Sequence, residues 1–303
     1  MVPARPDFIP IGRRFLALVS KPAQRLGWPQ IANGAGPCIR RRHRVADLTE
    51  VILRTEGLTK EFRGFAAVRE VDLAVRRGTI HALIGPNGAG KTTVFNLLTK
   101  FLTPTAGRIL YKGRDITRER PADIARLGVV RSFQISAVFP HLTVRENVRI
   151  ALQRPLGTSF HFWKSERSLD RLNDRADSLV AAVGLAEFTH VPAVELPYGR
   201  KRALEIATTL AMDPQLMLLD EPTQGMGHED VDRVTALIRQ AAARRTVLMV
   251  EHNMHVVSRI ADTITVLQRG QIIASGTYAE VACNPQVMEA YMGVPDGELR
   301  GAH

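Results

Sequence analysis

A glycine-rich stretch at residues 85–93 has the residue types and spacing of a loop that binds phosphate. It fits the pattern of a glycine, four further residues, and then Gly-Lys followed by Ser or Thr. Backbone N–H groups in such a loop point inward around phosphate oxygens, and the following helix N-terminus adds positive potential. We expect Lys91 to contact the β- and γ-phosphates of a nucleotide and the Thr92 hydroxyl to bind Mg²⁺. The residues predicted to bind nucleotide are Gly85, Pro86, Asn87, Gly88, Ala89, Gly90, Lys91, Thr92 and Thr93.

Further polar groups follow two apolar stretches of the kind that form buried strands. Asp220 and Glu221 come directly after residues 216–219, and His252 follows residues 246–250 closely. An acid at the carboxyl end of a buried strand lies where α/β sheets bind ligands. We interpret Asp220 as a Mg²⁺ ligand, Glu221 as the general base that activates water, and His252 as a contact to the γ-phosphate. A structural hydrogen-bonding role is the alternative for His252.

The elements that would position these residues are short strands alternating with helices. Short β-rich stretches punctuated by glycine come first, residues 142–211 are mostly helical in pattern, and strands then return. This alternation predicts an α/β core in which the helical stretch is an inserted subdomain. The expected strands are residues 51–55, 68–75, 80–84, 108–111, 216–219 and 246–250, with a hairpin at residues 264–273.

Charge is distributed unevenly along the chain of 303 residues, which carries +11 in total. The first 46 residues hold nine of the 41 Lys and Arg, one of the 30 acidic residues, and recurrent Pro and Gly. The remainder carries a net +3, so the large positive charge does not indicate a core that binds nucleic acid. The basic segment is either the product of a start codon assigned too far upstream or a flexible arm that contacts anionic lipid.

Composition excludes several classes of protein. Hydrophobic residues make up 45% and charged residues 23%, values that exclude collagen-like, low-complexity and wholly disordered chains. The two cysteines, Cys38 and Cys283, lie far apart, so neither a disulfide scaffold nor a zinc cluster is expected. The apolar runs are about one strand long, well short of the ~20 residues of a membrane-spanning helix. A role at a membrane would therefore require other subunits to span it.

The phosphate loop, the Asp-Glu pair and the strand-end histidine, in this order, resemble the ATP-binding subunits of ABC transporters. The signature motif of that family is matched in part by Leu-Pro-Tyr-Gly-Arg at residues 196–200, where Gly199 aligns with the second glycine. A Tyr-Gly signature followed by Leu-Glu-Ile-Ala is similar to the ATPases of branched-chain amino-acid importers. The resemblance implies a P-loop NTPase (RecA-like) core with an N-terminal antiparallel β region. It also implies that Tyr198, Gly199 and Arg200 contact ATP held by the opposite subunit of a dimer.

The resemblance assigns roles to further residues. Gln134 is implied to touch Mg²⁺ and water and to couple the ATPase to a membrane subunit. Phe62 is implied to stack on adenine, with a core phenylalanine as the alternative role and Phe65 as a competitor for the stacking position. Arg200 replaces the family's Gln and would either bring charge to the phosphates or be solvated. Gly227 stands where the family has an aspartate, which puts the usual carboxylate contact across the dimer in doubt.

The function implied by this resemblance is an ATPase that uses ATP and Mg²⁺ to power import of branched-chain amino acids. We expect a basic tail at residues 1–50, an ATPase domain at 51–293 with its helical subdomain at about 140–212, and a C-terminal tail at 294–303. The implied partners are transmembrane permease subunits, a second ATP-binding subunit and, indirectly, a periplasmic or extracellular binding protein, with no nucleic acid. The chain would lie at the cytoplasmic face of the membrane. The alternatives are import of urea or another amide, export of lipid, or a soluble ATPase acting on nucleic acid.

Overall fold

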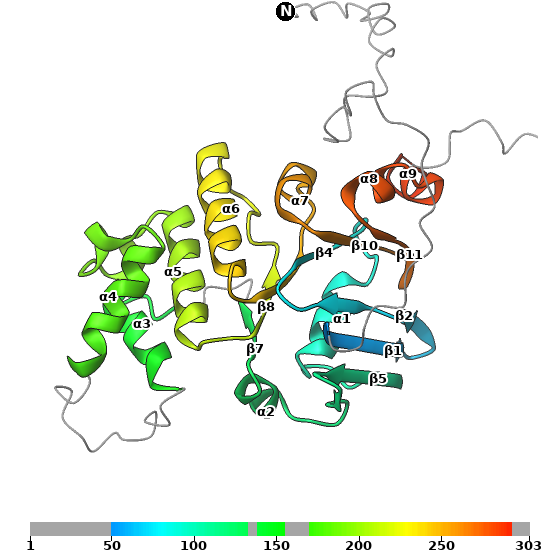
Figure 1. Ribbon diagram of the computed structural model, residues 1–303, viewed down its shortest axis with the longest axis horizontal. Coiled ribbons are helices and arrows are strands. Elements are labelled where there is room, and N and C mark those ends of the chain that lie inside the picture. Colours follow the sequence, from blue (N-terminus) through cyan, green and yellow to red (C-terminus); the bar gives the residue numbers. More distant parts are fainter. Residues whose placement is uncertain (1–49, 133–137, 155–169, 293–303) are drawn as a thin grey trace, which may run out of the picture.

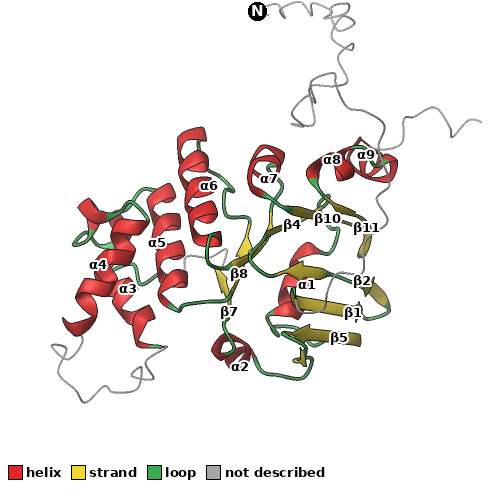
Figure 2. Cartoon of the chain, viewed as in Figure 1, coloured by secondary structure: helices red, strands yellow, loops and turns green. Residues whose placement is uncertain are grey.

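The computed structural model describes residues 50–132, 138–154 and 170–292 of the chain (Figure 1). The predictions made for Gln134 and for the two tails fall outside these ranges, apart from residue 50 itself. Within the ranges, strands and helices alternate along the chain (Figure 2), which confirms the predicted α/β class. None of the helices described is long and apolar enough to cross a membrane.

A six-stranded sheet of order β11-β10-β4-β9-β8-β7 forms the centre of the molecule. The strands from β10 to β7 run parallel, and β11 adds an antiparallel edge. Because β4, β8 and β9 are buried at every position, each reads in the sequence as a mainly apolar run, interrupted only by His81, Asp220 and Thr246. The strands are β4 (Ile80–Ile84), β7 (Val129–Ser132), β8 (Leu216–Asp220), β9 (Thr246–Val250), β10 (Thr263–Gln268) and β11 (Gln271–Gly276).

The N-terminal part of the described chain forms a second, antiparallel sheet, as predicted, of order β2-β1-β5-β6 with β3 also paired to β1. The single strand predicted at residues 68–75 is wrong, because this stretch divides into the end of β2 and the start of β3. The Thr55 hydroxyl donates to the Val71 carbonyl and accepts from the Leu73 N–H, so a side chain bridges the break. The strands are β1 (Val51–Phe62), β2 (Phe65–Val71), β3 (Ala74–Arg76), β5 (Ala106–Tyr111) and β6 (Arg114–Asp115).

Helices cover the sheets, and three of them, α3, α4 and α5, pack on one another at one end of the molecule (Figure 1). These three account for the helical pattern predicted at residues 142–211. Helix α3 begins at a capping box, in which the side chains of Thr143 and Glu146 each accept a hydrogen bond from the other residue's backbone N–H. The helices are α1 (Lys91–Leu98), α2 (Pro121–Arg126), α3 (Val144–Gln153), α4 (Asn173–Ala182), α5 (Tyr198–Ala211), α6 (His228–Ala242), α7 (Met254–Ile260), α8 (Tyr278–Ala282) and α9 (Pro285–Met292).

Two hydrophobic cores lie on opposite faces of the central sheet. Leu218 and Leu248 pack with α1 and the antiparallel sheet in one core, whereas Leu219 and Met249 pack with helices α3 to α7 in the other. Successive side chains of a strand point to opposite faces, so each central strand contributes to both cores. Burial on both sides fixes the register of the strands and hence the level at which their carboxyl ends stop.

Candidate functional site

The carboxyl ends of three neighbouring parallel strands gather the predicted chemistry at one edge of the central sheet. β9 lies between β4 and β8, with Leu83 and Asp220 both opposite Val250. The loop after β4 carries the phosphate-binding residues, the loop after β8 begins at Glu221, and the loop after β9 carries His252. Motifs far apart in the sequence therefore come together in space, as the strand-end argument predicts.

Close backbone packing requires two glycines of the phosphate loop. Gly85 has a φ of +151°, and a Cβ there would lie 2.1 Å from the backbone oxygen of Leu267 on β10. Gly90 has a φ of +101°, and its Cβ would lie 2.6 Å from the backbone oxygen of Ala67 on β2. The loop is thus pressed against both sheets, and α1 begins without a side-chain cap. N–H groups at an uncapped helix N-terminus are donors suited to phosphate.

Lys91 is buried at the start of α1, with 8% of its surface exposed. Its ammonium donates to the carbonyls of Gly85, at 2.7 Å, and Pro86, at 2.9 Å. Burial lowers the pKa of Lys91, and the nearby carboxylates of Glu221 and Asp220 oppose that shift. The structure therefore brings the lysine close to both strand-end acids, as a phosphate-binding site between them requires.

Asp220 lies at the end of β8 in a buried ion pair that the sequence analysis missed. Its Oδ2 accepts from Nη2 of Arg131 at 2.5 Å, and Nη1 of the same guanidinium donates to Asn96 of α1 at 2.6 Å. Asp220 and Arg131 expose 3% and 9% of their side chains. A charged residue within the short strand β7 was the one available signal, and its partner is 89 residues away. Arg131 thus connects the metal ligand predicted at β8 to the helix that follows the phosphate loop.

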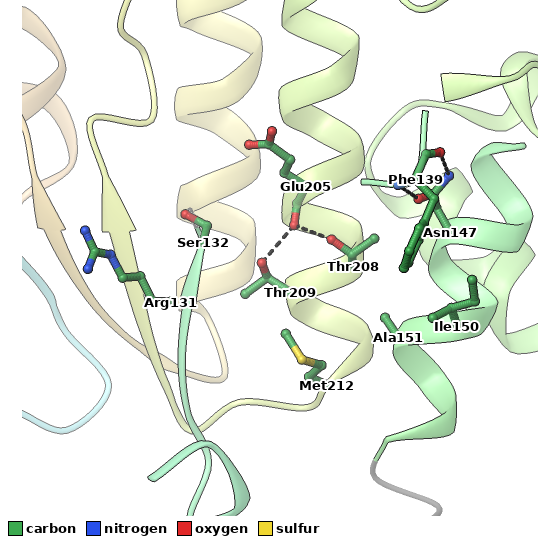
Figure 3. A pocket seen from close by; sticks show the side chains of 10 residues that line it. All are labelled: Arg131, Ser132, Phe139, Asn147, Ile150, Ala151, Glu205, Thr208, Thr209 and Met212. Carbon is green, nitrogen blue, oxygen red and sulfur yellow. Dashed lines mark hydrogen bonds between the residues drawn. The ribbon is translucent and has the colours of Figure 1, made fainter. Parts of the chain in front are cut away.

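A cavity of about 180 Å³ lies beside Arg131, between β7 and the helices α3 and α5. Figure 3 shows the guanidinium of Arg131 pointing away from the other residues that line it. On the α5 side, the Thr208 and Thr209 hydroxyls donate to the backbone carbonyl of Glu205. Ser132 lines the cavity as well and is the last residue described before Gln134. The cavity therefore lies beside the end of β7, two residues before Gln134 in the sequence.

Glu221 and His252 approach each other across the ends of β8 and β9. Glu221 Oε1 lies 4.0 Å from His252 Nδ1, and the two side chains are 20% and 54% exposed. The backbone of Glu221 has a φ of +45°, a left-handed conformation that is unusual for a residue other than glycine. Its N–H still donates to the Val250 carbonyl at 2.9 Å, which keeps the loop bonded to β9. A carboxylate and an imidazole placed in this way can share the task of holding and deprotonating a water molecule.

The signature residues lie on the opposite side of the central sheet from α1. Tyr198 is 58% exposed at the start of α5, whose buried residues belong to the core that does not contain α1. A Cβ on Gly199 would lie 2.3 Å from Cγ of Asp230, a residue of α6. The guanidinium of Arg200 lies 3.9 Å from the centre of the Phe188 ring, so the side chain makes a stacking contact within its own subunit. The sequence analysis had considered phosphate contact or solvation for Arg200 and had missed this stack.

Three other predicted positions are exposed. Phe62 is 43% exposed at the end of β1, opposite Phe65, which is 71% exposed, so the alternative of a core phenylalanine is wrong. Thr92 is exposed in the first turn of α1, next to the partly buried Thr93. A Cβ on Gly227 would meet no atom within 4 Å, so no contact within the subunit requires glycine at this position.

The C-terminal helix α9 also reaches the phosphate loop. The phenol of Tyr291 hydrogen-bonds the backbone of Gly85, while burial raises the pKa of Tyr291 to about 12. The phenol is therefore protonated at neutral pH and holds α9 beside the loop. This contact has no signal in the sequence, because Gly85 and Tyr291 are about 200 residues apart.

Comparison with protein families gives two matches. Residues 68–224 match the family model described as ABC transporter, which covers about half of the chain. Residues 271–297 match the model described as branched-chain amino acid ATP-binding cassette transporter. This second match includes β11, α8 and α9, and therefore the helix that carries Tyr291.

Individual proteins similar to this chain extend the match. The chain is 40% identical over 253 residues to the high-affinity branched-chain amino acid transport ATP-binding protein BraF of Pseudomonas aeruginosa, covering 81% of this chain and 99% of BraF. It is 37% identical over 253 residues to LivG of Escherichia coli K12, with the same coverage. The ADP conformation of MJ1267, an ATP-binding cassette of an ABC transporter, is 30% identical with a TM-score of 0.70 over 80% of this chain and 99% of MJ1267. Because the family model covers about half of the chain and BraF is 40% identical over 81% of it, the chain belongs to the ATP-binding cassette family of ABC transporter ATPases.

Proposed function

We propose that this chain is the ATP-hydrolysing subunit of an importer for branched-chain amino acids. The proposal rests on the carboxyl end of the central sheet, where Lys91 lies near Asp220 and Glu221 and where His252 faces Glu221. The cargo is supported by the branched-chain transporter model at residues 271–297. BraF and LivG, which are described as branched-chain amino acid transport ATP-binding proteins, support the same cargo.

The residues around the phosphate loop fit ATP together with Mg²⁺. The uncapped start of α1 and the buried Lys91 ammonium offer N–H donors and positive charge to phosphate oxygens. Hydroxyl, carboxylate and amide oxygens are suitable ligands for Mg²⁺, so Thr92, Asp220 and Gln134 are proposed to hold the ion. When bound there, Mg²⁺ would supply charge neutralisation on the phosphates.

In the proposed mechanism, Glu221 takes a proton from the water that attacks the γ-phosphorus. Its carboxylate is partly shielded and lies 4.0 Å from His252, so one water could contact both side chains. His252 donates a hydrogen bond to the charge that develops on the transferred phosphoryl group, and Lys91 holds the phosphate oxygens. Phe62 presents an exposed ring on the β1–β2 hairpin and is proposed to stack on adenine.

A second ATP-binding subunit is proposed to complete each site. Within one subunit, Tyr198 and Gly199 lie on the far side of the sheet from α1, so a neighbouring subunit is proposed to bring its own copies to the phosphate. Because Arg200 stacks on Phe188, the N–H groups at the start of α5 are proposed to face the nucleotide in place of the guanidinium.

The proposed membrane partners are transmembrane permease subunits, which bind at the cytoplasmic face of the inner membrane. The cavity between β7, α3 and α5 begins at Ser132, close in sequence to Gln134, and is our proposed place of contact. A movement of the permease there would reach Asp220 through Arg131. A periplasmic or extracellular binding protein would act through the permease, and no nucleic acid is involved.

Substitution of the general base tests the ATPase mechanism. Glu221→Gln should bind ATP with near wild-type affinity and lose most of its hydrolysis, because an amide cannot accept the proton from water. Glu229→Gln, in the exposed first turn of α6, is the matched control and should retain activity. Lys91→Ala should bind ATP weakly. Wild-type turnover in Glu221→Gln, or unchanged affinity in Lys91→Ala, would contradict the assigned role.

Co-purification from membranes tests the cargo. The native complex should contain permease subunits, and vesicles rebuilt with a binding protein should take up leucine, isoleucine or valine in an ATP-dependent manner. Uptake of urea or another amide in place of these, or outward movement of lipid, would replace the cargo while leaving the ATPase intact. Recovery with ribosomes or nucleic acid and without a permease would refute the transport role.

A further inference from the structure

We propose that Glu251 is a positioning residue that fixes the catalytic distance between Glu221 and His252. Glu251 lies between Val250, the last residue of β9, and His252, and none of its surface is exposed. The proposal rests on the roles proposed above for Glu221 and His252, and it adds a buried carboxylate that the sequence pattern did not single out.

The carboxylate of Glu251 accepts four hydrogen bonds from two separate loops. Oε1 accepts from the backbone N–H of Thr223, at 3.2 Å, and from the Thr223 hydroxyl. Oε2 accepts from the backbone N–H of His252, at 2.7 Å, and from that of Asn253, at 3.0 Å. Each oxygen therefore binds one loop, and all four donors are neutral groups.

The two loops are those that carry the proposed chemistry. Backbone pairing between β8 and β9 ends at Asp220 and Val250, with one further bond from the Glu221 N–H. Beyond that point the carboxylate of Glu251 continues the connection by joining Thr223, two residues after Glu221, to the backbone of His252. Glu221 Oε1 and His252 Nδ1, 4.0 Å apart, belong to the two loops that this carboxylate joins.

The other side of His252 is fixed as well. Asn253 caps α7, because its side chain accepts from the N–H groups of His255 and Val256. The His252 backbone is thus held by Glu251 on one side and by the start of α7 on the other. The imidazole itself stays half-exposed and available to a substrate.

A carboxylate at this position cannot be replaced by an amide without loss. Glutamine has nearly the same shape as glutamate, but its NH₂ group would face either the donors of Thr223 or those of His252 and Asn253. Two N–H donors would then point at each other in a buried place, and one loop would have to move. Because misplacement of catalytic groups by about 1 Å can cost about 100-fold in rate, we expect Glu251→Gln to lower kcat roughly 10- to 100-fold.

The test compares ATP hydrolysis and nucleotide affinity in matched variants of the full-length chain. Glu251→Gln should lower kcat with KM for ATP changed less than about threefold, since the phosphate loop is untouched. Thr223→Val should give a smaller loss of kcat, and Thr223→Ser, which keeps the hydroxyl, should restore it. Thr235→Val is the control, because the hydroxyl of Thr235 is equally buried but bonds within α6, and its kcat should stay at the wild-type value.

A double-mutant cycle separates positioning from general destabilisation. If Glu251 acts through His252, then adding Glu251→Gln to His252→Ala should cause no further loss of kcat. The positioning role of Glu251 would be overturned by fully additive losses of kcat. It would also be overturned if Glu251→Gln and Thr223→Val both kept wild-type kcat while His252→Ala was inactive. Either result would leave the proposed role of His252 in place. Wild-type kcat in His252→Ala would overturn both this inference and the proposed role of His252. If Glu251→Gln does not fold, the Thr223 pair and the Thr235 control decide the question.

Discussion

Replacement of Arg131 by methionine should destabilise the fold strongly, because it removes the guanidinium that is hydrogen-bonded to the buried carboxylate of Asp220. Both side chains are almost fully enclosed, and the guanidinium binds Asp220 at 2.5 Å and Asn96 at 2.6 Å. Removal of one partner of a buried ion pair typically costs about 3–5 kcal/mol. At about 2–4 °C per kcal/mol for a domain of this size, the melting temperature should fall by roughly 6–20 °C.

The assay for Arg131→Met is reversible urea unfolding at pH 7, and the control is a pair in which the arginine is largely enclosed but the acid is exposed. Arg245 bonds Asp213 at 3.2 Å, but Asp213 is 79% exposed, so Arg245→Met should cost less than about 1 kcal/mol. Adding Asp220→Asn to Arg131→Met removes the stranded charge and should recover most of the lost stability. If Arg131→Met costs no more than Arg245→Met, or if Asp220→Asn recovers nothing, the buried pair does not have the energetic role derived from its geometry.

Three further predictions concern other parts of the site. Burial lowers the pKa of His81 to about 4, so the folded state binds fewer protons than the unfolded state between pH 4 and 6.5. The contribution of neutral His81 to the free energy of unfolding should be fully present above pH 6.5 and should fall by roughly 3 kcal/mol as the pH drops to 4. In urea titrations, His81→Gln should reduce this loss. Gly85→Ala should lower the free energy of unfolding by at least about 2 kcal/mol and weaken ATP binding, because its Cβ would meet Leu267. Gly88→Ala, whose Cβ meets no atom, should cost only about 1 kcal/mol from its positive φ. Equal losses of stability in calorimetry would contradict the packing argument. Arg200→Ala should lower stability by about 1 kcal/mol while leaving the KM for ATP nearly unchanged, and a several-fold rise in that KM would instead place the guanidinium at the nucleotide.

The sequence by itself determined the chemistry that depends on neighbouring residues. The phosphate loop is a local structure, because its glycines, lysine and following helix are consecutive, so its pattern can be recognised without the fold. Asp220, Glu221 and His252 were found because each follows an apolar run, and parallel strands bring their carboxyl ends to one edge. The alternation of apolar patterns predicted the α/β class and the helical stretch that contains α3, α4 and α5, whereas the N-terminal antiparallel sheet was implied by the family resemblance.

Only the tertiary structure decided which buried groups hold that chemistry in place. Arg131 meets Asp220 across 89 residues, and Glu251 meets Thr223 across 28 residues, because β8 lies between β7 and β9 in the sheet. The sequence indicated most strands of the central sheet but not β7, which carries Arg131, and it did not indicate the order of the strands. Without that order a buried charge has no identifiable partner. The physical reason is that a charge can be buried only beside its counter-charge or hydrogen-bond donors, and these come from whichever strand lies next to it in space.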